Sequence, residues 1–193
     1  MTTDNISPQN KESDGDKHMI EEARNNLVPY FFDSIPAELK SYDNWVLWRY
    51  GIRINKEDGK KKLTKPPYTV NGYKAATNKP ETWTSFDKAV AVLQSGIYNG
   101  IGFVFTGTPY VGIDIDDCRD VATGEITPEA AEVITLCNSY VEISPSGEGI
   151  HIIIKGKLPP GRRKRKPFEM YGENSPRYFT MTGLLYNVGG VLQ

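Results

Sequence analysis

Tyr110-Val-Gly-Ile-Asp-Ile-Asp116 is the stretch of sequence that decides the fold. Its residues alternate, which predicts a strand with large apolar side chains on one face and Asp114 and Asp116 on the other. Carboxylates at positions i and i+2 of a strand lie roughly 6–7 Å apart and repel each other. A divalent cation between them would turn this repulsion into a binding site. Such a pair is also common on an ordinary solvent-facing strand, and Asp117, which follows it, is expected in a turn.

A turn rich in serine and glycine follows about 30 residues later, at Ser144-Pro-Ser-Gly-Glu-Gly-Ile-His151. Strands at 140–143 and 150–155 are expected to flank it as an antiparallel hairpin. Its glycines let backbone N–H groups approach an anion, its serines add hydroxyl donors, and His151 would lie at the mouth of the loop. A lone histidine in a strand is otherwise usually structural. The candidate phosphate-binding residues of this turn are Ser144, Ser146, Gly147, Gly149 and His151.

A third polar position lies in Phe168-Glu-Met-Tyr171, which is expected to be another strand. Alternation places Glu169 and Tyr171 on one face, so Glu169 offers a third carboxylate. Taken alone, Glu169 has the pattern of an ordinary exposed residue, and Arg177 is equally suited to a surface ion pair.

Composition indicates a globular protein that lies outside membranes. The 193 residues are 38% hydrophobic and carry a net charge of −1, enough chain for one well-buried domain or two small lobes. Cys118 and Cys137 fit no zinc pattern or disulfide framework, which favours a reducing compartment. No apolar stretch approaches the roughly 20 residues of a membrane span, and no secretory signal is seen. We therefore expect a cytoplasmic protein without a membrane partner.

The near-neutral net charge conceals two basic runs, at 60–65 and 162–166. Such runs are usually solvated loops, but beside an acidic metal site they can bind a polyanion. The residues expected to contact nucleic acid in that case are Lys61, Lys62, Arg162, Arg163 and Arg165.

The secondary-structure pattern predicts an α/β protein of the α+β type. Residues 1–28 are expected to form a disordered or partly helical tail, with a short helix over 18–28. The rest of the chain, 29–193, is expected to form one domain with an N-terminal α/β lobe at 29–100 and a second lobe at 101–193.

Helices starting at Ser85 and Thr127 are expected to cover one face of a mainly antiparallel sheet. The apolar side of the 110–116 strand needs such a cover. The opposite face would stay uncovered and would carry the polar residues Asp114, Asp116, His151 and Glu169.

In this order, the three motifs resemble those of the primase–polymerase domains of phages and plasmids, in the archaeo-eukaryotic primase superfamily. The matching segments are Gly112–Asp116, Ser144–His151 and Phe168–Tyr171. The segments at 45–50, 64–68 and 82–86 also look like the N-terminal parts of such domains, so the resemblance covers roughly residues 35–185. It implies that residues 29–193 form a primase–polymerase domain with an RRM-like catalytic sheet at 101–193.

The resemblance also implies roles for individual residues. Asp114, Asp116 and Glu169 would be the catalytic residues and would hold two divalent ions, Mg²⁺ or Mn²⁺, although the family usually has aspartate at the third position. His151 would contact the phosphates of the incoming nucleotide together with the turn residues, and Lys65 and Arg177 would contact phosphate or template. No ligands for a zinc-binding insert are present.

The implied function is template-directed nucleotidyl transfer in phage or plasmid DNA replication. Its partners would be a DNA template and primer, an NTP or dNTP, and a replicative helicase in cis or in trans. An alternative is a non-catalytic module of the same fold that binds single-stranded DNA, which Glu169 in place of aspartate favours. A nicking-type replication endonuclease is disfavoured, because His151 is followed by Ile152 and Ile153 rather than by a second histidine.

Overall fold

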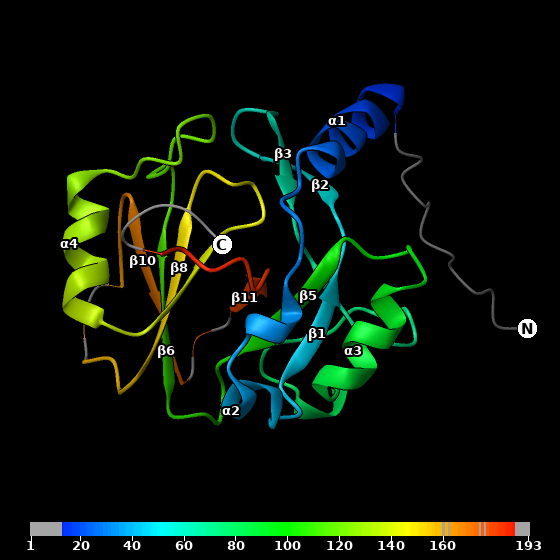
Figure 1. The fold of residues 1–193 in the computed structure, drawn as a ribbon. Coiled ribbons are helices and arrows are strands. Elements are labelled where there is room, and N and C mark those ends of the chain that lie inside the picture. The colour runs from blue at the N-terminus through cyan, green and yellow to red at the C-terminus, as the bar shows by residue number, and fades with distance from the viewer. Residues whose placement is uncertain (1–12, 160, 162, 174, 176, 188–193) are drawn as a thin grey trace, which may run out of the picture.

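The computed structural model describes residues 13–187 except residues 160, 162, 174 and 176. Within this part, the strands form two larger sheets and a hairpin, all antiparallel (Figure 1). The four-stranded sheet has the order β11 (Tyr178–Met181), β5 (Gly100–Val104), β1 (Trp45–Trp48), β4 (Pro67–Tyr68). The five-stranded sheet has the order β7 (Tyr140–Ile143), β8 (Ile150–Lys155), β6 (Tyr110–Ile115), β10 (Phe168–Tyr171), β9 (Lys164–Arg165). The hairpin pairs β2 (Gly51–Ile54) with β3 (Lys61–Thr64).

The helices are α1 (Asp14–Asn25), α2 (Ala37–Lys40), α3 (Phe86–Leu93) and α4 (Pro128–Cys137), with 3-10 turns at Phe32–Ser34 and Pro80–Thr82. The predicted α+β class with mainly antiparallel strands is confirmed. No helix in the described ranges is long and apolar enough to cross a membrane. Asp117 has φ of 51° directly after β6, which confirms the turn expected there.

The two larger sheets do not follow the order of the chain. β5 and β11 come from the expected second lobe, yet they are hydrogen-bonded into the sheet of β1 and β4. Strand pairing therefore links residues 29–100 with residues 101–193. The predicted division into two lobes at this boundary stays a prediction. In the chain, β11 follows all strands of the five-stranded sheet, yet it pairs with β5 of the four-stranded sheet (Figure 1). The chain therefore enters the four-stranded sheet, builds the five-stranded sheet, and then returns to the first.

Helix α1 begins earlier than its predicted start at residue 18, because Ser13 caps it. The Ser13 hydroxyl accepts a hydrogen bond from the Asp16 N–H, and the Asp16 carboxylate accepts one from the Ser13 N–H. This reciprocal capping box satisfies two N–H groups that a helix start otherwise leaves unpaired. Residues 13–17 are thus helix and cap, whereas residues 1–12 of the predicted tail lie outside the described part.

One face of the five-stranded sheet packs against α4, as the alternation predicted. Ile113 and Ile115 of β6 and Ile150 and Ile152 of β8 are at most 5% exposed and form a cluster with Ala130 and Ile134 of α4. Thr127 caps that helix through its hydroxyl, which accepts a hydrogen bond from the Ala130 N–H. Figure 1 shows α4 lying along the outer side of this sheet, with α3 beside β1 and β5 on the opposite side of the molecule.

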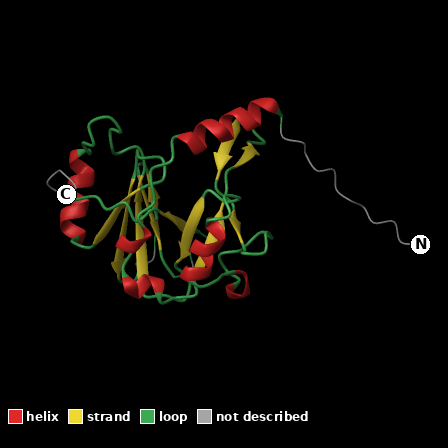
Figure 2. Cartoon of the chain, turned by 45° about the vertical axis from the view of Figure 1, so that its right-hand side comes forward, coloured by secondary structure: helices red, strands yellow, loops and turns green. Residues whose placement is uncertain are grey.

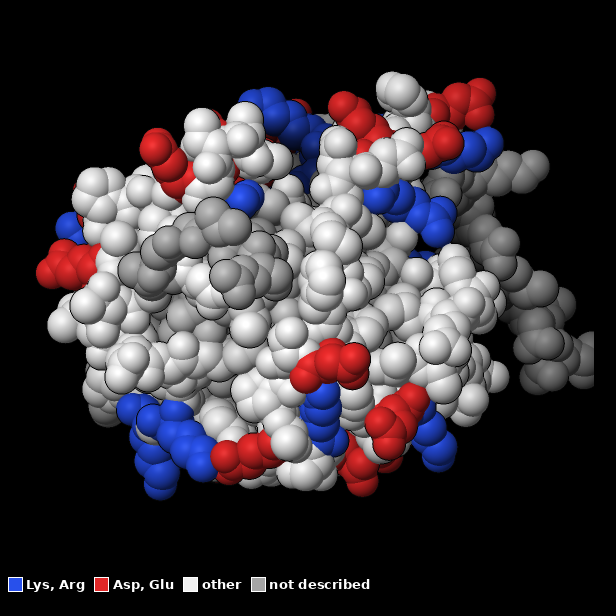
Figure 3. Space-filling model, viewed as in Figure 1, with Lys and Arg blue, Asp and Glu red and all other residues white. Residues whose placement is uncertain are grey.

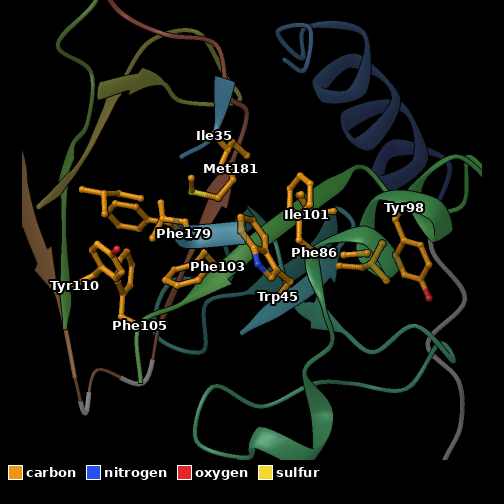
Figure 4. Close-up of a cluster of buried hydrophobic side chains, with 14 of the residues drawn as sticks. Ile35, Trp45, Phe86, Tyr98, Ile101, Phe103, Phe105, Tyr110, Phe179 and Met181 are labelled. Atoms are coloured by element: carbon orange, nitrogen blue, oxygen red, sulfur yellow. The ribbon is translucent and has the colours of Figure 1, made fainter. Parts of the chain in front are cut away.

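The other face of the five-stranded sheet is not uncovered, which corrects the prediction. An aromatic cluster fills the space between the two sheets and includes Trp45, Phe103, Phe105, Tyr110 and Phe179 (Figure 4). Gly112 allows this contact, because a Cβ atom there would lie 2.5 Å from Phe179 and 2.6 Å from Phe105. The four-stranded sheet therefore covers part of the polar face near Gly112, while Asp114 and His151 border a cleft.

Candidate functional site

A row of charged residues crosses the five-stranded sheet from edge to edge. The hydrogen-bonding register sets each member directly opposite the next, in the order Lys164, Glu169, Asp114, His151, Glu142. Directly opposed residues of antiparallel strands project to the same face with Cβ atoms about 5 Å apart. The register thus brings together residues of all three motifs. It adds Lys164, from the second basic run, and Glu142, for which the sequence analysis predicted no role.

Asp114 and Asp116 border one cleft of about 900 Å³. Asp114 lies within β6 and its side chain is 20% exposed, whereas Asp116 follows the strand end and is exposed. Burial raises the pKa of Asp114; His151 opposes this shift, the nearby Asp116 adds to it, and the cations Lys65 and Lys164 oppose it. A carboxylate in such a position gains from any further positive charge that enters the cleft.

His151 is held from behind by a glutamate that is entirely buried. Its Nδ1 lies 3.2 Å from Oε1 of Glu142, and its Nε2 lies 3.7 Å from Oδ1 of Asp114. The ring stacks on Phe179 with centroids 4.6 Å apart. Burial by itself lowers the pKa of His151, but the Glu142 hydrogen bond and the charges of Asp114 and Glu142 outweigh it, so the pKa is raised above its ordinary value. This favours an imidazolium whose Nε2–H side borders the cleft.

Glu142 is 0% exposed, and all its partners are donors. It accepts hydrogen bonds from the backbone N–H groups of Thr182 and Gly183, from the Tyr140 hydroxyl and from His151. Such a set compensates a carboxylate for the loss of water. The sequence analysis missed Glu142, although the predicted hairpin contained the signal: if residues 143 and 150 are opposed, residues 142 and 151 are opposed as well.

Glu169 lies beside Asp114 but has other partners. It forms an ion pair with Lys164 and accepts a hydrogen bond from the Tyr171 hydroxyl. Within the described ranges, no three Asp, Glu, His or Cys side chains are gathered closely enough to hold a metal ion. The three predicted ligands are therefore neighbours on one sheet face without a completed cage.

Several predicted phosphate-binding residues do line the cleft. Lys65 borders it with Ser144 and Ser146, and the exposed Arg177 borders it beside the Tyr171 ring. Burial lowers the pKa of Lys65, and the two cleft aspartates partly offset this effect. The cleft thus combines two carboxylates with cations from four separate segments, namely Arg53, Lys62 with Lys65, Lys164 and Arg177.

The backbone N–H groups of the turn glycines form hydrogen bonds within the turn itself. The N–H of Gly147 donates to the Ser144 carbonyl at 2.9 Å, and the N–H of Gly149 donates to the Ser144 hydroxyl at 3.1 Å. Gly147 has φ of 81°, and a Cβ atom at Gly149 would lie 3.0 Å from the Ile115 carbonyl oxygen. These glycines therefore shape the turn, and the serine hydroxyls are the groups that border the cleft.

The basic runs divide according to the direction of each side chain. Lys62 borders the cleft, whereas its neighbour Lys61 forms an ion pair with Asp16 of α1 at 2.8 Å. In the second run Lys164 borders the cleft, while Arg163 and Arg165, which were predicted to contact nucleic acid, are exposed and not among its lining residues. The alternation of a strand explains this split. Arg162 lies outside the described residues.

Comparison with curated proteins finds a phage relative of the chain. The chain is 36% identical over 163 residues to a protein of Nitratiruptor phage NrS-1 named DNA primase-polymerase. The chain is a relative of a phage primase–polymerase. The match covers 79% of this chain but 21% of the phage protein, so the chain spans about a fifth of that relative's length. No protein-family model matches the chain. The predicted resemblance to phage primase–polymerase domains is confirmed by this relative.

Proposed function

We propose that the chain is a DNA-synthesising nucleotidyltransferase of the primase–polymerase type, acting in phage or plasmid DNA replication. The observation that carries the proposal is the charged row on the five-stranded sheet, with Asp114 and Asp116 in the same cleft as the cations Lys65 and Lys164. The similarity to the phage primase–polymerase supports the same reaction class. Its substrates would be a DNA template with a primer and an NTP or dNTP, and a replicative helicase is a candidate partner.

The donor set fits divalent cations such as Mg²⁺ or Mn²⁺. Mg²⁺ in nucleotide sites is usually held by one or two carboxylates together with substrate phosphates, rather than by a complete protein cage. Asp114 and Asp116 match this pattern, and Glu169 would join them if a cation took the place of the Lys164 ammonium. When bound, the two ions would activate the attacking hydroxyl and stabilise the triphosphate and the departing pyrophosphate.

The side chains of the cleft would orient the nucleotide. His151 is fixed on one side by Glu142 and by the Phe179 ring, so its Nε2–H is available to a phosphate oxygen without rotation of the imidazole. Ser144 and Ser146 would add hydroxyl donors, and Lys65 and Arg177 would supply positive charge toward the phosphates or the template. A prepositioned set of donors favours the charge that develops during transfer, because it does not have to reorganise.

The direct test is primer extension by the full chain on a primed DNA template with dNTPs or NTPs. We expect incorporation that requires Mg²⁺ or Mn²⁺, stops with EDTA, and is abolished by Asp114→Ala and by Asp116→Ala. Circular dichroism and thermal unfolding of the variants provide the control for folding. Extension by either alanine variant at the wild-type rate would falsify the assignment of the metal ligands.

A second candidate is a non-catalytic module that binds single-stranded DNA. The contacts of Glu169 with Lys164 and Tyr171, which take up the third carboxylate, favour it. The same assay separates the two functions: tight DNA binding by the wild-type chain with no metal-dependent incorporation would support the module and exclude the polymerase.

A further inference from the structure

A second groove lies across the β2–β3 hairpin from the cleft, and nothing in the charged row reaches it. Adjacent residues of β3 face opposite sides, so that Lys62 borders the cleft and Lys61 borders the groove. Arg53 and Thr64 border both, so the two hollows adjoin over the hairpin. Helix α1 forms one wall of the groove and lies beside the hairpin in both ribbon views (Figures 1 and 2).

The groove is strongly basic. Five exposed cations line it, namely Arg24, Arg49, Arg53, Lys61 and Lys74. Asp16 is the one carboxylate among its described lining residues, and it is paired with Lys61. Figure 3 shows Lys and Arg side chains beside α1, together with Asp and Glu side chains on the same part of the surface. This charge balance favours a polyanion rather than a metal or a small cation.

The groove also presents apolar surface between its cations. Ile54 and Ile97 line the groove and are 54% and 59% exposed. Arg49 and Lys74 lie over the buried Tyr68 ring, at 4.5 Å and 4.6 Å from its centroid, so the ring helps to hold these two cations in place. Cations interleaved with apolar surface suit a groove that follows the backbone of a single strand while its bases rest on the protein.

We propose that this groove binds single-stranded DNA, as the continuation of the template strand that leaves the cleft over the β2–β3 hairpin. The inference rests on the proposed function for the direction of the strand, but the binding site itself stands on the groove's own residues. Its contacts would be to phosphates, so it would bind without preference for sequence.

The test is the salt dependence of binding, measured by fluorescence anisotropy with labelled oligothymidylate in the absence of nucleotide and metal. The variant is Arg24→Gln combined with Lys74→Gln, since both side chains are exposed and come from separate segments that line the groove. Each lost phosphate contact lowers the slope of log K against log salt by about 0.7 for a single strand. We expect the slope to fall by about 1.4 and the affinity at about 0.1 M salt to fall on the order of 25-fold.

The matched control is Lys88→Gln, which removes an exposed cation from α3, outside both hollows. It should change the slope of log K against log salt by much less than the loss of one phosphate contact would. An unchanged slope in the double variant, or an equal change in the control, would overturn the inference, as would tighter binding of a duplex than of a single strand. If the wild-type chain synthesises DNA and the groove variant binds DNA as tightly as wild type, the groove inference is wrong but the proposed function stands. If DNA binding depends on the groove and the wild-type chain synthesises no DNA, the proposed function is wrong but the groove inference stands.

Discussion

The cleft and the groove lie on either side of one hairpin and are built in different ways. The charged groups of the cleft include Asp114 and His151, which are largely buried and fixed by the register of a five-stranded sheet. Those of the groove are exposed side chains on a helix, a hairpin and loops. A site for chemistry needs groups that are already in position and removed from water, whereas a site that only holds a polyanion needs charge density.

The largest expected effect separates the two sites by function. Asp114→Asn removes one of the carboxylates proposed to bind metal while keeping the shape of the side chain, so synthesis should fall by at least about 10³-fold, in line with several kcal/mol of transition-state stabilisation. The affinity for single-stranded DNA in the absence of metal should stay the same or rise slightly, because a negative charge is lost. Primer extension and anisotropy on the same preparations measure both quantities.

The groove variant should show the reverse pattern. Its synthesis should recover at saturating DNA, because its defect is in binding. A loss of DNA affinity in Asp114→Asn as large as the loss in the groove variant would mean that the two sites are not distinct.

The second effect concerns Glu142, the buried carboxylate that holds His151 in the cleft. Glu142→Gln replaces an acceptor by an amide whose NH₂ group faces donors, so it should lower the free energy of unfolding by about 1–3 kcal/mol, the cost of an unsatisfied buried group. Loss of the carboxylate should also release the Nδ1 proton of His151 and lower its pKa. We expect kcat to fall about 10- to 100-fold, the range seen when a partner that orients a site residue is removed. Nitrogen NMR of the imidazole reports its protonation state, and urea unfolding reports stability.

Tyr140→Phe is the matched control for that variant. It removes one hydrogen bond to Glu142 but leaves the contact between Glu142 and His151. Its stability should fall slightly, while the protonation state of His151 and kcat stay near the wild-type values. Equal kcat losses in the two variants would show that Glu142 acts through general stability and does not orient the histidine.

The smallest effect is a pH dependence at the wall of the groove. Hydrogen bonds from Lys61 and Ser13 lower the pKa of Asp16 to about 2, from an ordinary value of 3.8. A lowered carboxyl pKa means that the contribution of Asp16 to stability is fully present above the unfolded value and is lost as pH falls from 3.8 toward about 2. The difference in unfolding free energy between wild type and Asp16→Asn should therefore be constant near neutral pH and shrink below pH 3.8.

Asp14→Asn serves as the comparison for Asp16→Asn. Asp14 pairs only with Lys17 among the described ion pairs, and both side chains are exposed. Such surface pairs contribute little to stability. If both variants showed the same pH dependence, the contact between α1 and the hairpin would not be its source.

Much of the site could be predicted because strand alternation is a local property. The pattern of residues 110–116 correctly separated the isoleucines under α4 from the two aspartates, and the turn at 144–149 correctly predicted the hairpin that presents His151. The predicted helix start at residue 18 was wrong, because the capping role of Ser13 was not considered in a segment that looked merely polar.

The sequence was least informative where a side chain's surroundings depend on a distant partner. In the second basic run, the pairing of β9 with β10 turns Lys164 toward Glu169, while the roles predicted for Arg163 and Arg165 stay predictions. In the turn, the N–H groups of Gly147 and Gly149 bond to Ser144, which the sequence did not indicate. Local sequence does not specify which side chains of a strand face a partner that lies elsewhere in the chain.

The amino-acid sequence alone determined the strands, their two-faced character and the identity of the acidic and imidazole groups, because these follow from backbone periodicity and side-chain chemistry. Only the tertiary structure decided that Glu142 supports His151, that the four-stranded sheet covers part of the polar face, and that two hollows flank one hairpin. These features arise from register and packing between segments that lie far apart in the sequence.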